Sequence, residues 1–184
     1  MLTSRRRRQD RPEGITLLES LVSLMILALA VLGMLAVQIR TLAEMQTGVR
    51  RAQAVRLVED LGERIKSNPA GYAELASYVT GWNATPTASV DCSRTACNAT
   101  DQAKWDVANW KLRVADALPL GNAELFYSAD EDSPRRRQLG VLVGWRANER
   151  THDAAMRMAL QSGIAEAGTT CPAGLICHLA YVQP

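Results

Sequence analysis

The sequence predicts an α+β fold in which a long N-terminal helix, membrane-spanning in its first half, packs on a small antiparallel β-sheet. Two observations predict the helix: an uninterrupted apolar run begins at Ile15, and apolar residues then recur every three to four positions as far as Asn68-Pro69. A third predicts the sheet, because short apolar segments bounded by turn residues recur after residue 120.

Composition limits what the rest of the chain can be. Its 184 residues suit one domain in addition to the N-terminal segment, and aromatic residues at 5% require a mainly aliphatic core. Residues 1–14 hold five arginines against two acidic residues, which leaves 16 basic and 17 acidic residues in the remainder. A body so close to neutral argues against a general nucleic-acid binder, and no specific nucleic-acid partner is predicted.

Residues 1–14 are predicted to be a cytoplasmic leader peptide, because basic segments beside an apolar run stay in the cytoplasm. From Ser20 to Ile39 the chain has 20 residues without a charge, about the length that a helix needs to cross a bilayer. The run is too long for a secretory signal, and no small-residue cleavage site directly follows it. Residues 15–39 are therefore predicted to span the inner membrane once, with the C-terminal domain in the periplasm.

Glu19 is the one charged residue inside the apolar segment. A carboxylate at that depth is costly and marks a functional site. Cleavage after Gly14 would create an amino group on Ile15, four residues before Glu19. In an assembly of subunits, that amine and Glu19 of a neighbouring subunit would neutralise each other. Gly14 and Ile15 are therefore predicted to be processing residues, and Glu19 an assembly residue.

Residues 40–67 are predicted to be the amphipathic half of the same helix. Apolar or small residues recur in steps of three and four, while arginines and glutamates fill the other faces. Asn68 ends the helix, because a residue before proline avoids helical backbone angles. The predicted buried stripe consists of Leu42, Met45, Val49, Ala52, Val55, Val58, Leu61 and Ile65.

Residues 68–184 are predicted to form the globular domain. Residues 67–100 are rich in small and polar residues and indicate a loop with one short helix over 71–79. A second helix is predicted over 101–118, with Asp101 as its N-cap. Its predicted buried face consists of Trp105, Val107, Ala108, Leu112, Ala115 and Leu118.

Strands are predicted over 122–128, 138–147 and 174–182, with a turn over 130–134 between the first two. Residues 152–163 fit a helix by their alanine content and a strand by the alternation of Met156, Met158 and Leu160. We choose the strand, because it would extend the preceding sheet.

The four cysteines form two close pairs, Cys92/Cys97 and Cys171/Cys177. Local pairing of an even number of cysteines fits disulfide bonds in an oxidising compartment, which the predicted periplasmic location provides. The alternative is a structural zinc site, but the second pair is more widely spaced than zinc ligands usually are. Disulfides within each pair are therefore favoured over a metal.

No pattern of catalytic or cofactor-binding residues is visible. The two histidines, His152 and His178, stand in no metal-ligand pattern, and His178 is predicted to be a surface residue. The sequence contains no phosphate-binding glycine loop and no nucleophile elbow. We predict neither an enzyme nor a bound cofactor or metal.

The segment Gly14-Ile15-Thr16-Leu17-Leu18-Glu19 resembles the cleavage motif of type IV prepilins. The basic leader, the glycine, the glutamate at the fifth position after it and the apolar stretch match that family in order. Ile15 stands where phenylalanine or methionine is commoner in the family. The resemblance implies cleavage after Gly14 by an inner-membrane prepilin peptidase, and methylation of the new N-terminus.

A more detailed resemblance is to minor pilins of the PilV type. It rests on Ala70-Gly71-Tyr72 after the long helix, on Cys92 and Cys97 before a tryptophan-containing helix, and on the end of that helix at Leu118-Pro119-x-Gly121. A strand with Val141, Val143 and Trp145 follows.

This resemblance implies a minor pilin that takes part in type IV pilus assembly, as a priming, tip or low-abundance subunit. The implied partners are the prepilin peptidase, other minor pilins, the major pilin, the inner-membrane assembly machinery and membrane lipid. After processing, the chain is expected to move from the inner membrane into the pilus filament. Two alternatives stay open: a pseudopilin of a type II secretion system, and a periplasmic binding domain held by an uncleaved signal-anchor.

Overall fold

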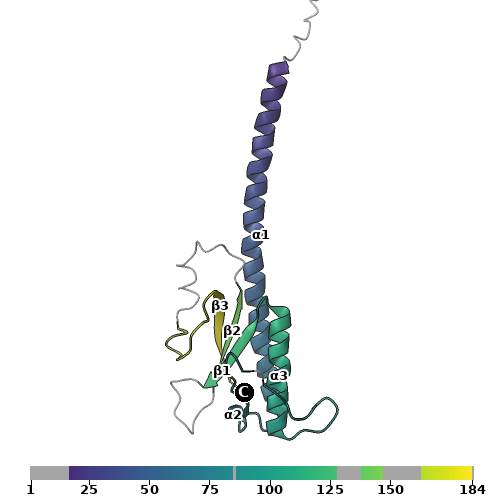
Figure 1. Ribbon diagram of the computed structural model, residues 1–184, viewed down its shortest axis with the longest axis vertical. Coiled ribbons are helices and arrows are strands. Elements are labelled where there is room, and N and C mark those ends of the chain that lie inside the picture. Colours follow the sequence, from purple (N-terminus) through teal and green to yellow (C-terminus); the bar gives the residue numbers. More distant parts are fainter. Residues whose placement is uncertain (1–16, 85, 128–137, 147–162, 184) are drawn as a thin grey trace, which may run out of the picture. The chain divides into compact units, whose positions relative to one another are not determined.

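The computed structural model describes residues 17–84, 86–127, 138–146 and 163–183. The chain divides into two compact units, Met1–Leu42 and Ala43–Pro184, each taken by itself below. Figure 1 shows the helices and strands in their chain order. They are α1 (Leu17–Ser67), α2 (Leu75–Tyr78), α3 (Ala99–Ala117), β1 (Asn122–Tyr127), β2 (Leu139–Arg146) and β3 (Leu175–Val182).

The predicted α+β fold is confirmed: the long apolar helix α1 packs on a small antiparallel sheet through its second part. The three described strands lie in the order β1-β2-β3, with β2 paired to both neighbours. The predicted strands over 122–128, 138–147 and 174–182 match β1, β2 and β3 closely. The predicted strand over 152–163 and the predicted turn over 130–134 lie outside the described residues.

The main core lies between the inner face of the sheet and the helices of the second unit. Side chains from the second part of α1, from α2 and from α3 meet alternate residues of the strands there, as the two-residue period of a strand requires. Val182 of β3 lies against Gly62 of α1, where a Cβ atom would stand 3.3 Å from its Cγ1. The core residues with no exposed surface include Ala54, Leu61, Ile65, Tyr78, Trp110, Val114, Leu139, Val141 and Val143.

The outer face of the sheet carries a second, smaller apolar cluster built on Leu142, Ile164 and Cys177. Aromatic rings cover two glycines of β2 there: a Cβ atom on Gly140 would collide with the Phe126 ring, and one on Gly144 with the Trp82 ring. These rings explain how glycines sit in the central strand, a position that glycine ordinarily weakens.

Helix α3 begins two residues before its predicted start, and its N-cap is Asn98 in place of the predicted Asp101. The Asn98 side chain accepts a hydrogen bond from Asp101 N over 2.8 Å and donates one from Nδ2 to Asp101 Oδ2 over 2.8 Å. The asparagine therefore satisfies a backbone donor of the first turn, and the aspartate adds a negative charge near the positive end of the helix dipole.

The predicted buried face of α3 was wrong in part. Val107 and Leu118 are buried as predicted, but Leu112 is 68% exposed and Ala115 is exposed. The side chains that face the core are Ala103, Asp106, Val107, Trp110 and Val114. The stripe is rotated from the predicted one because Trp110 fits between the helices, and Asp106 is held there by a partner on α1.

The predicted stripe on α1 was also correct only in part. Val58, Leu61 and Ile65 are buried as predicted, together with Ala54. Met45 and Val49 are exposed, and Ala52 and Val55 face solvent. Within this unit the sheet and α3 therefore cover α1 only from about Ala54 onward.

Candidate functional site

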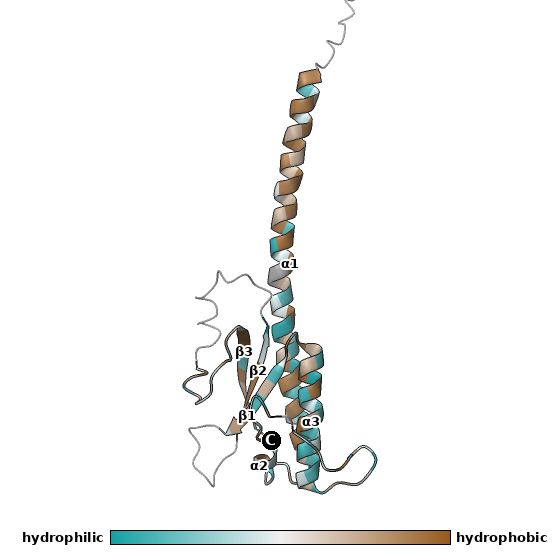
Figure 2. Cartoon of the chain, in the orientation of Figure 1, coloured by the Kyte–Doolittle hydropathy of each residue, from teal (hydrophilic) through white to brown (hydrophobic). Residues whose placement is uncertain are grey.

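The first part of α1 presents large apolar side chains on all its faces. From Leu17 to Leu42 every described side chain is exposed, and Figure 2 shows this stretch as almost continuously hydrophobic. Its most apolar 18-residue window has a mean hydropathy of 2.6, and none of it is buried. The helix is long and apolar enough to cross a membrane. Such a surface needs lipid or another protein chain around it.

Of the predicted processing and assembly residues, Glu19 lies in the first turn of α1, with an exposed side chain, and Gly14 and Ile15 lie outside the described residues. Hydroxyl groups in the apolar stretch bond back to their own helix: Ser23 Oγ donates to Glu19 O over 2.7 Å, and Thr41 Oγ1 donates to Val37 O over 2.9 Å. These bonds satisfy polar groups that lipid would otherwise leave without partners.

Trp110 joins α3 to α1. Its ring is fully buried, and its Nε1–H donates a hydrogen bond of 2.7 Å to the carbonyl oxygen of Leu57. The tryptophan therefore gives the helix pair both apolar contact and a fixed register.

A charged network lies beside this contact. Arg64 on α1 donates to Asp60 Oδ2 over 2.9 Å and to Asp106 Oδ1 on α3 over 3.3 Å, and Arg113 lies 3.6 Å from Asp60 Oδ1. Asp106 is buried, and its Oδ2 has no hydrogen-bond partner within the described part of the chain. Burial raises the pKa of the Asp106 carboxyl above its ordinary value, although the nearby Arg64 opposes that shift.

Asn68, which the sequence indicated only as the end of α1, is a buried connector of three segments. Its Nδ2 donates to the Tyr78 hydroxyl over 3.1 Å and to Ala99 O over 2.9 Å, while its Oδ1 accepts from Ala70 N over 3.2 Å. Close by, only glycine fits at position 71, because the Cβ atom of any other residue would collide with the carbonyl oxygen of Ile65. The end of α1 is thereby tied to α2 and to the start of α3.

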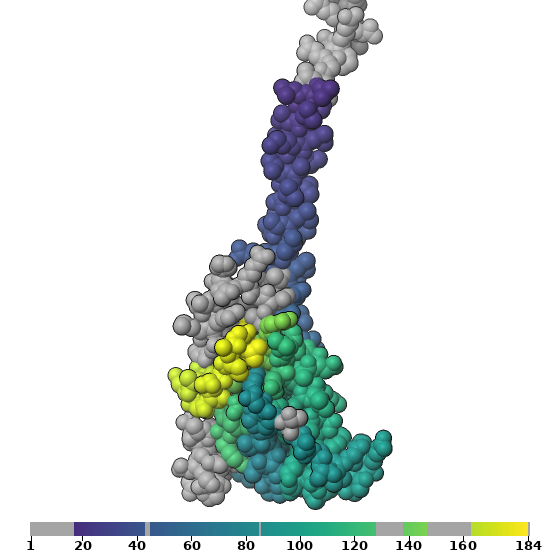
Figure 3. All heavy atoms as spheres, in the orientation of Figure 1, coloured from purple at the N-terminus to yellow at the C-terminus, as the bar shows by residue number. Residues whose placement is uncertain are grey.

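Both predicted disulfides are present, Cys92–Cys97 and Cys171–Cys177. The first closes a small loop, in a largely exposed segment ahead of α3 that projects from the surface in Figure 3. The second ties the segment before β3 to the outer face of the sheet, where Cys177 is buried. Thr169 adds a bond of 3.0 Å from its Oγ1 to Glu124 Oε2.

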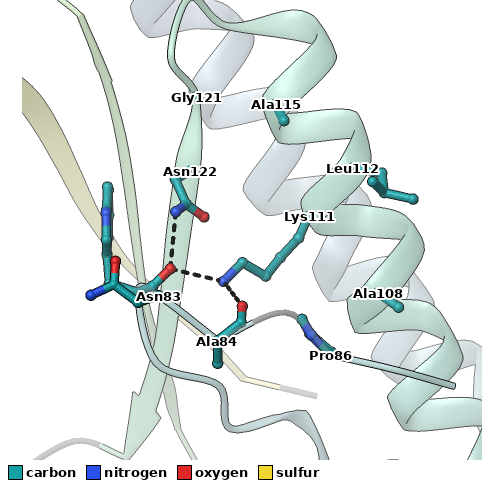
Figure 4. Close-up of a pocket in the computed structure, with 10 residues that line it drawn as sticks. Asn83, Ala84, Pro86, Ala108, Lys111, Leu112, Ala115, Gly121 and Asn122 are labelled. Atoms are coloured by element: carbon teal, nitrogen blue, oxygen red, sulfur yellow. Dashed lines mark hydrogen bonds between the residues drawn. The ribbon is translucent and has the colours of Figure 1, made fainter.

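Lys111 holds the loop that follows residue 80 against α3. Its Nζ donates to the carbonyl oxygens of Gly81, Trp82 and Ala84 over 3.0, 3.2 and 2.8 Å, and Asn122 Nδ2 donates to Trp82 O over 2.9 Å. Figure 4 draws the bonds to Trp82 and Ala84 as dashed lines. Burial lowers the pKa of the Lys111 ammonium, while the charge of Glu124 opposes that shift. A cavity of about 410 Å³ lies beside this contact.

His178, predicted to be a surface residue, is instead half-buried on β3. Burial lowers the pKa of its imidazole, and the positive charge of Arg51 lowers it further. No group of three metal-ligating side chains occurs within the described residues.

A family model described as Type IV pilin Tt1218-like matches residues 36–108. No curated protein and no solved structure matches the chain. The matched segment covers less than half of the 184 residues. It contains the second part of α1, all of α2, the Cys92–Cys97 loop and the first half of α3. This partial match, with a long apolar helix packed on a small antiparallel sheet, supports a relationship to the type IV pilin family.

Proposed function

We propose that this protein is a minor pilin, a membrane-anchored precursor that joins a type IV pilus as a priming, tip or low-abundance subunit. The observation that carries the proposal is the division of one helix into two environments. Up to Leu42 its apolar side chains are exposed, whereas from Ala54 it forms part of a folded core. The similarity of residues 36–108 to a type IV pilin family supports it.

The exposed apolar surface suits a subunit that changes its surroundings. In the inner membrane, lipid covers the apolar half of the helix, and in a filament the same side chains of neighbouring subunits cover each other. The cost of leaving lipid is small, because side-chain packing replaces lipid contact with other apolar contact. The partners in this proposal are the major pilin, other minor pilins and the assembly machinery of the inner membrane.

Processing precedes assembly in this proposal. Residues 1–14 are a cytoplasmic leader that a prepilin peptidase removes after Gly14, and the freed amine of Ile15 is then available to Glu19 of a neighbouring subunit. Residues 15–39 span the membrane, 40–67 form the amphipathic half of the helix, and 68–184 form the periplasmic domain. Methylation of the Ile15 amine belongs to the same proposal.

Two cysteine pairs and the resemblance to PilV-type minor pilins favour a pilus over the alternative of a type II secretion pseudopilin. The second alternative, a periplasmic binding domain on an uncleaved signal-anchor, requires a leader that is never removed. Removal of the leader therefore distinguishes the minor pilin and the pseudopilin, which are both cleaved, from the signal-anchored binding domain, which is not.

The test is intact-mass and N-terminal peptide mass spectrometry of the protein purified from membranes. The wild-type chain is expected to begin at Ile15, and Gly14→Val to begin at Met1. Gly33→Val is the matched control and should be processed normally, since Gly33 lies within α1 with open space around it. A wild-type chain that keeps residues 1–14 would overturn the proposal. Counting pili and secreted substrates in a deletion strain then separates a pilus from a secretion role.

A further inference from the structure

Two stripes of apolar residues run along the part of α1 that belongs to the second unit, and only one of them is buried. The buried stripe consists of Ala54, Val58, Leu61 and Ile65. The other begins at Met45 and Val49, whose side chains are 62% and 58% exposed, and continues at the exposed Ala52. The core of the domain therefore leaves an apolar surface of α1 uncovered.

The two stripes lie on opposite sides of the helix. Successive residues of an α-helix are turned by about 100°, so positions two apart differ by about 200°. Ala52, Arg56 and Glu59 each stand two residues before a member of the buried stripe, and all three are exposed. They therefore lie on the side of α1 that is turned away from the core. The outward face of α1 consists of Met45, Val49, Ala52, Arg56 and Glu59.

The outward face has the spacing of a coiled-coil seam. Its residues follow one another at intervals of four, three, four and three positions, which is the heptad repeat through which two parallel helices interlock. The first three are apolar and the last two carry opposite charges. Arg56 and Glu59 make no ion pair within the part of the chain that the structure describes, whereas Glu63, one turn further on, pairs with Lys66 over 3.3 Å.

We propose that the outward face packs on the outward face of a second copy of this chain, as a parallel two-fold pair of helices. The parallel orientation rests on the proposed function, because chains that span the membrane once in the same direction present their helices in parallel. In a two-fold contact each residue meets its own counterpart, so Met45, Val49 and Ala52 of the two copies bury one another.

The charges select a second copy as the occupant of this face. Arg56 lies three residues before Glu59, so in a parallel pair it stands about 4.5 Å along the axis from Glu59 of the second copy, which its long side chain reaches. The pair of helices thus gains two equivalent ion pairs next to its apolar contact. Lipid or a neutral helix would cover the apolar residues and leave both charges without a partner. The apolar contact is short, and anchoring in one membrane raises the effective concentration at which the helices meet.

Cysteine cross-linking in membranes tests the contact in the full chain. The four native cysteines are held in disulfides, so an introduced cysteine is the one free thiol. Ala52→Cys places that thiol on the outward face, and mild oxidation of membranes should convert the chain to a disulfide-linked dimer. Gln53→Cys is the matched control, because it is equally exposed, one residue away and turned from the outward face by about 100°. The dimer should form severalfold faster with Ala52→Cys than with Gln53→Cys.

Charge reversal tests the ion pairs within the Ala52→Cys chain. Arg56→Glu should slow formation of the dimer about fivefold, because two exposed attractive pairs, each of modest strength, become repulsive. Glu59→Arg should slow it for the same reason. The double variant Arg56→Glu/Glu59→Arg should restore the original rate, since the attraction returns with the signs exchanged. Lys104→Glu makes the same change of charge at an exposed position on α3 and should leave the rate unchanged.

The proposal is overturned if Ala52→Cys forms the dimer no faster than Gln53→Cys, or if the double reversal does not restore the rate. A cross-linked product that mass spectrometry identifies as containing a different protein would also overturn it, because the outward face then has another partner. The N-terminal mass of the same samples tests the pilin proposal separately. A chain that begins at Ile15 but forms no dimer rejects the pairing alone, and a dimer of chains that keep residues 1–14 rejects the leader processing alone.

Discussion

The indole nitrogen of Trp110 donates a hydrogen bond to the backbone carbonyl of Leu57, 53 residues earlier in the chain and 2.7 Å away. The contact fixes α3 against the part of α1 that enters the core, so the two helices cannot slide past each other without breaking it. Within the second unit, α3 and the second part of α1 are therefore fixed in register.

Replacing Trp110 tests this contact. Trp110→Phe keeps most of the apolar ring but loses the donor, and should cost about 1 kcal/mol of the free energy of unfolding. Trp110→Ala also leaves a cavity and should cost about 3–5 kcal/mol. Leu112→Ala is the control on the same helix: at 68% exposure it should change stability by less than about 0.5 kcal/mol. Denaturant unfolding followed by circular dichroism measures all three. A larger effect at Leu112 than at Trp110 would contradict the observed orientation of α3.

Asp106 makes stability depend on pH. Its pKa is raised in the folded protein, so folding favours the protonated carboxyl. The stability linked to that proton is present below the unfolded pKa of about 3.9 and is lost as pH rises through the higher folded pKa. The amide that Asp106→Asn introduces cannot ionise, so this variant should not lose that stability as the pH rises. The stability of the variant relative to wild type should therefore increase from pH 3 to pH 7, measured by unfolding at each pH. Parallel pH profiles would show that Asp106 does not titrate in this way.

The two disulfides should differ in importance although their loops are nearly equal in size. In the chain-entropy model each contributes about 2 kcal/mol. Cys177 is also part of the apolar cluster on the outer face, whereas Cys92 and Cys97 lie in a largely exposed segment. The double replacement Cys171→Ala/Cys177→Ala should therefore destabilise more than Cys92→Ala/Cys97→Ala. Melting temperatures under non-reducing conditions compare them, and the reverse order would contradict the assigned packing.

Lys111→Met should loosen the loop after residue 80. Methionine keeps the length of the side chain but removes the donor that Gly81, Trp82 and Ala84 share. Leaving these carbonyl oxygens without a donor should lower the free energy of unfolding by about 1–3 kcal/mol. Hydrogen exchange of the amides from 81 to 84 should accelerate selectively. Lys104→Met, on the exposed face of α3, is the control and should leave those exchange rates unchanged.

Glu19→Ala tests the proposed assembly role. A carboxylate in an apolar segment is costly, so the variant should insert in the membrane as well as wild type or better. Its incorporation into filaments should fall, because the amine of Ile15 loses its proposed partner in the neighbouring subunit. Quantitative blotting of sheared filaments and of membrane fractions measures the amount of each protein in the two places. Equal incorporation of both proteins would refute the pairing role, and a failure of cleavage would move that role to peptidase recognition.

The sequence predicted the positions of the helices and strands better than it predicted which of their faces are buried. Strand β2 was visible because it is apolar along nearly its whole length, and the end of α1 was visible because Pro69 follows Asn68. The inward face of α3 was not predictable from apolar spacing, since Asp106 is buried only because Arg64 lies on another element to receive it. Asn68 shows the same limit: its burial depends on Tyr78 and Ala99, whose proximity is decided by tertiary packing.

The contact between Val182 of the last strand and Gly62 of α1 has a consequence for biogenesis. The chain emerges N-terminus first, so the helix is in place long before its last packing partner is synthesised. Contacts between residues so distant in sequence form slowly, because the long loop between them must first close. The core is therefore complete only once Val182 has been synthesised, and a chain that stops before β3 leaves Gly62 and the inner face of the sheet without that covering strand.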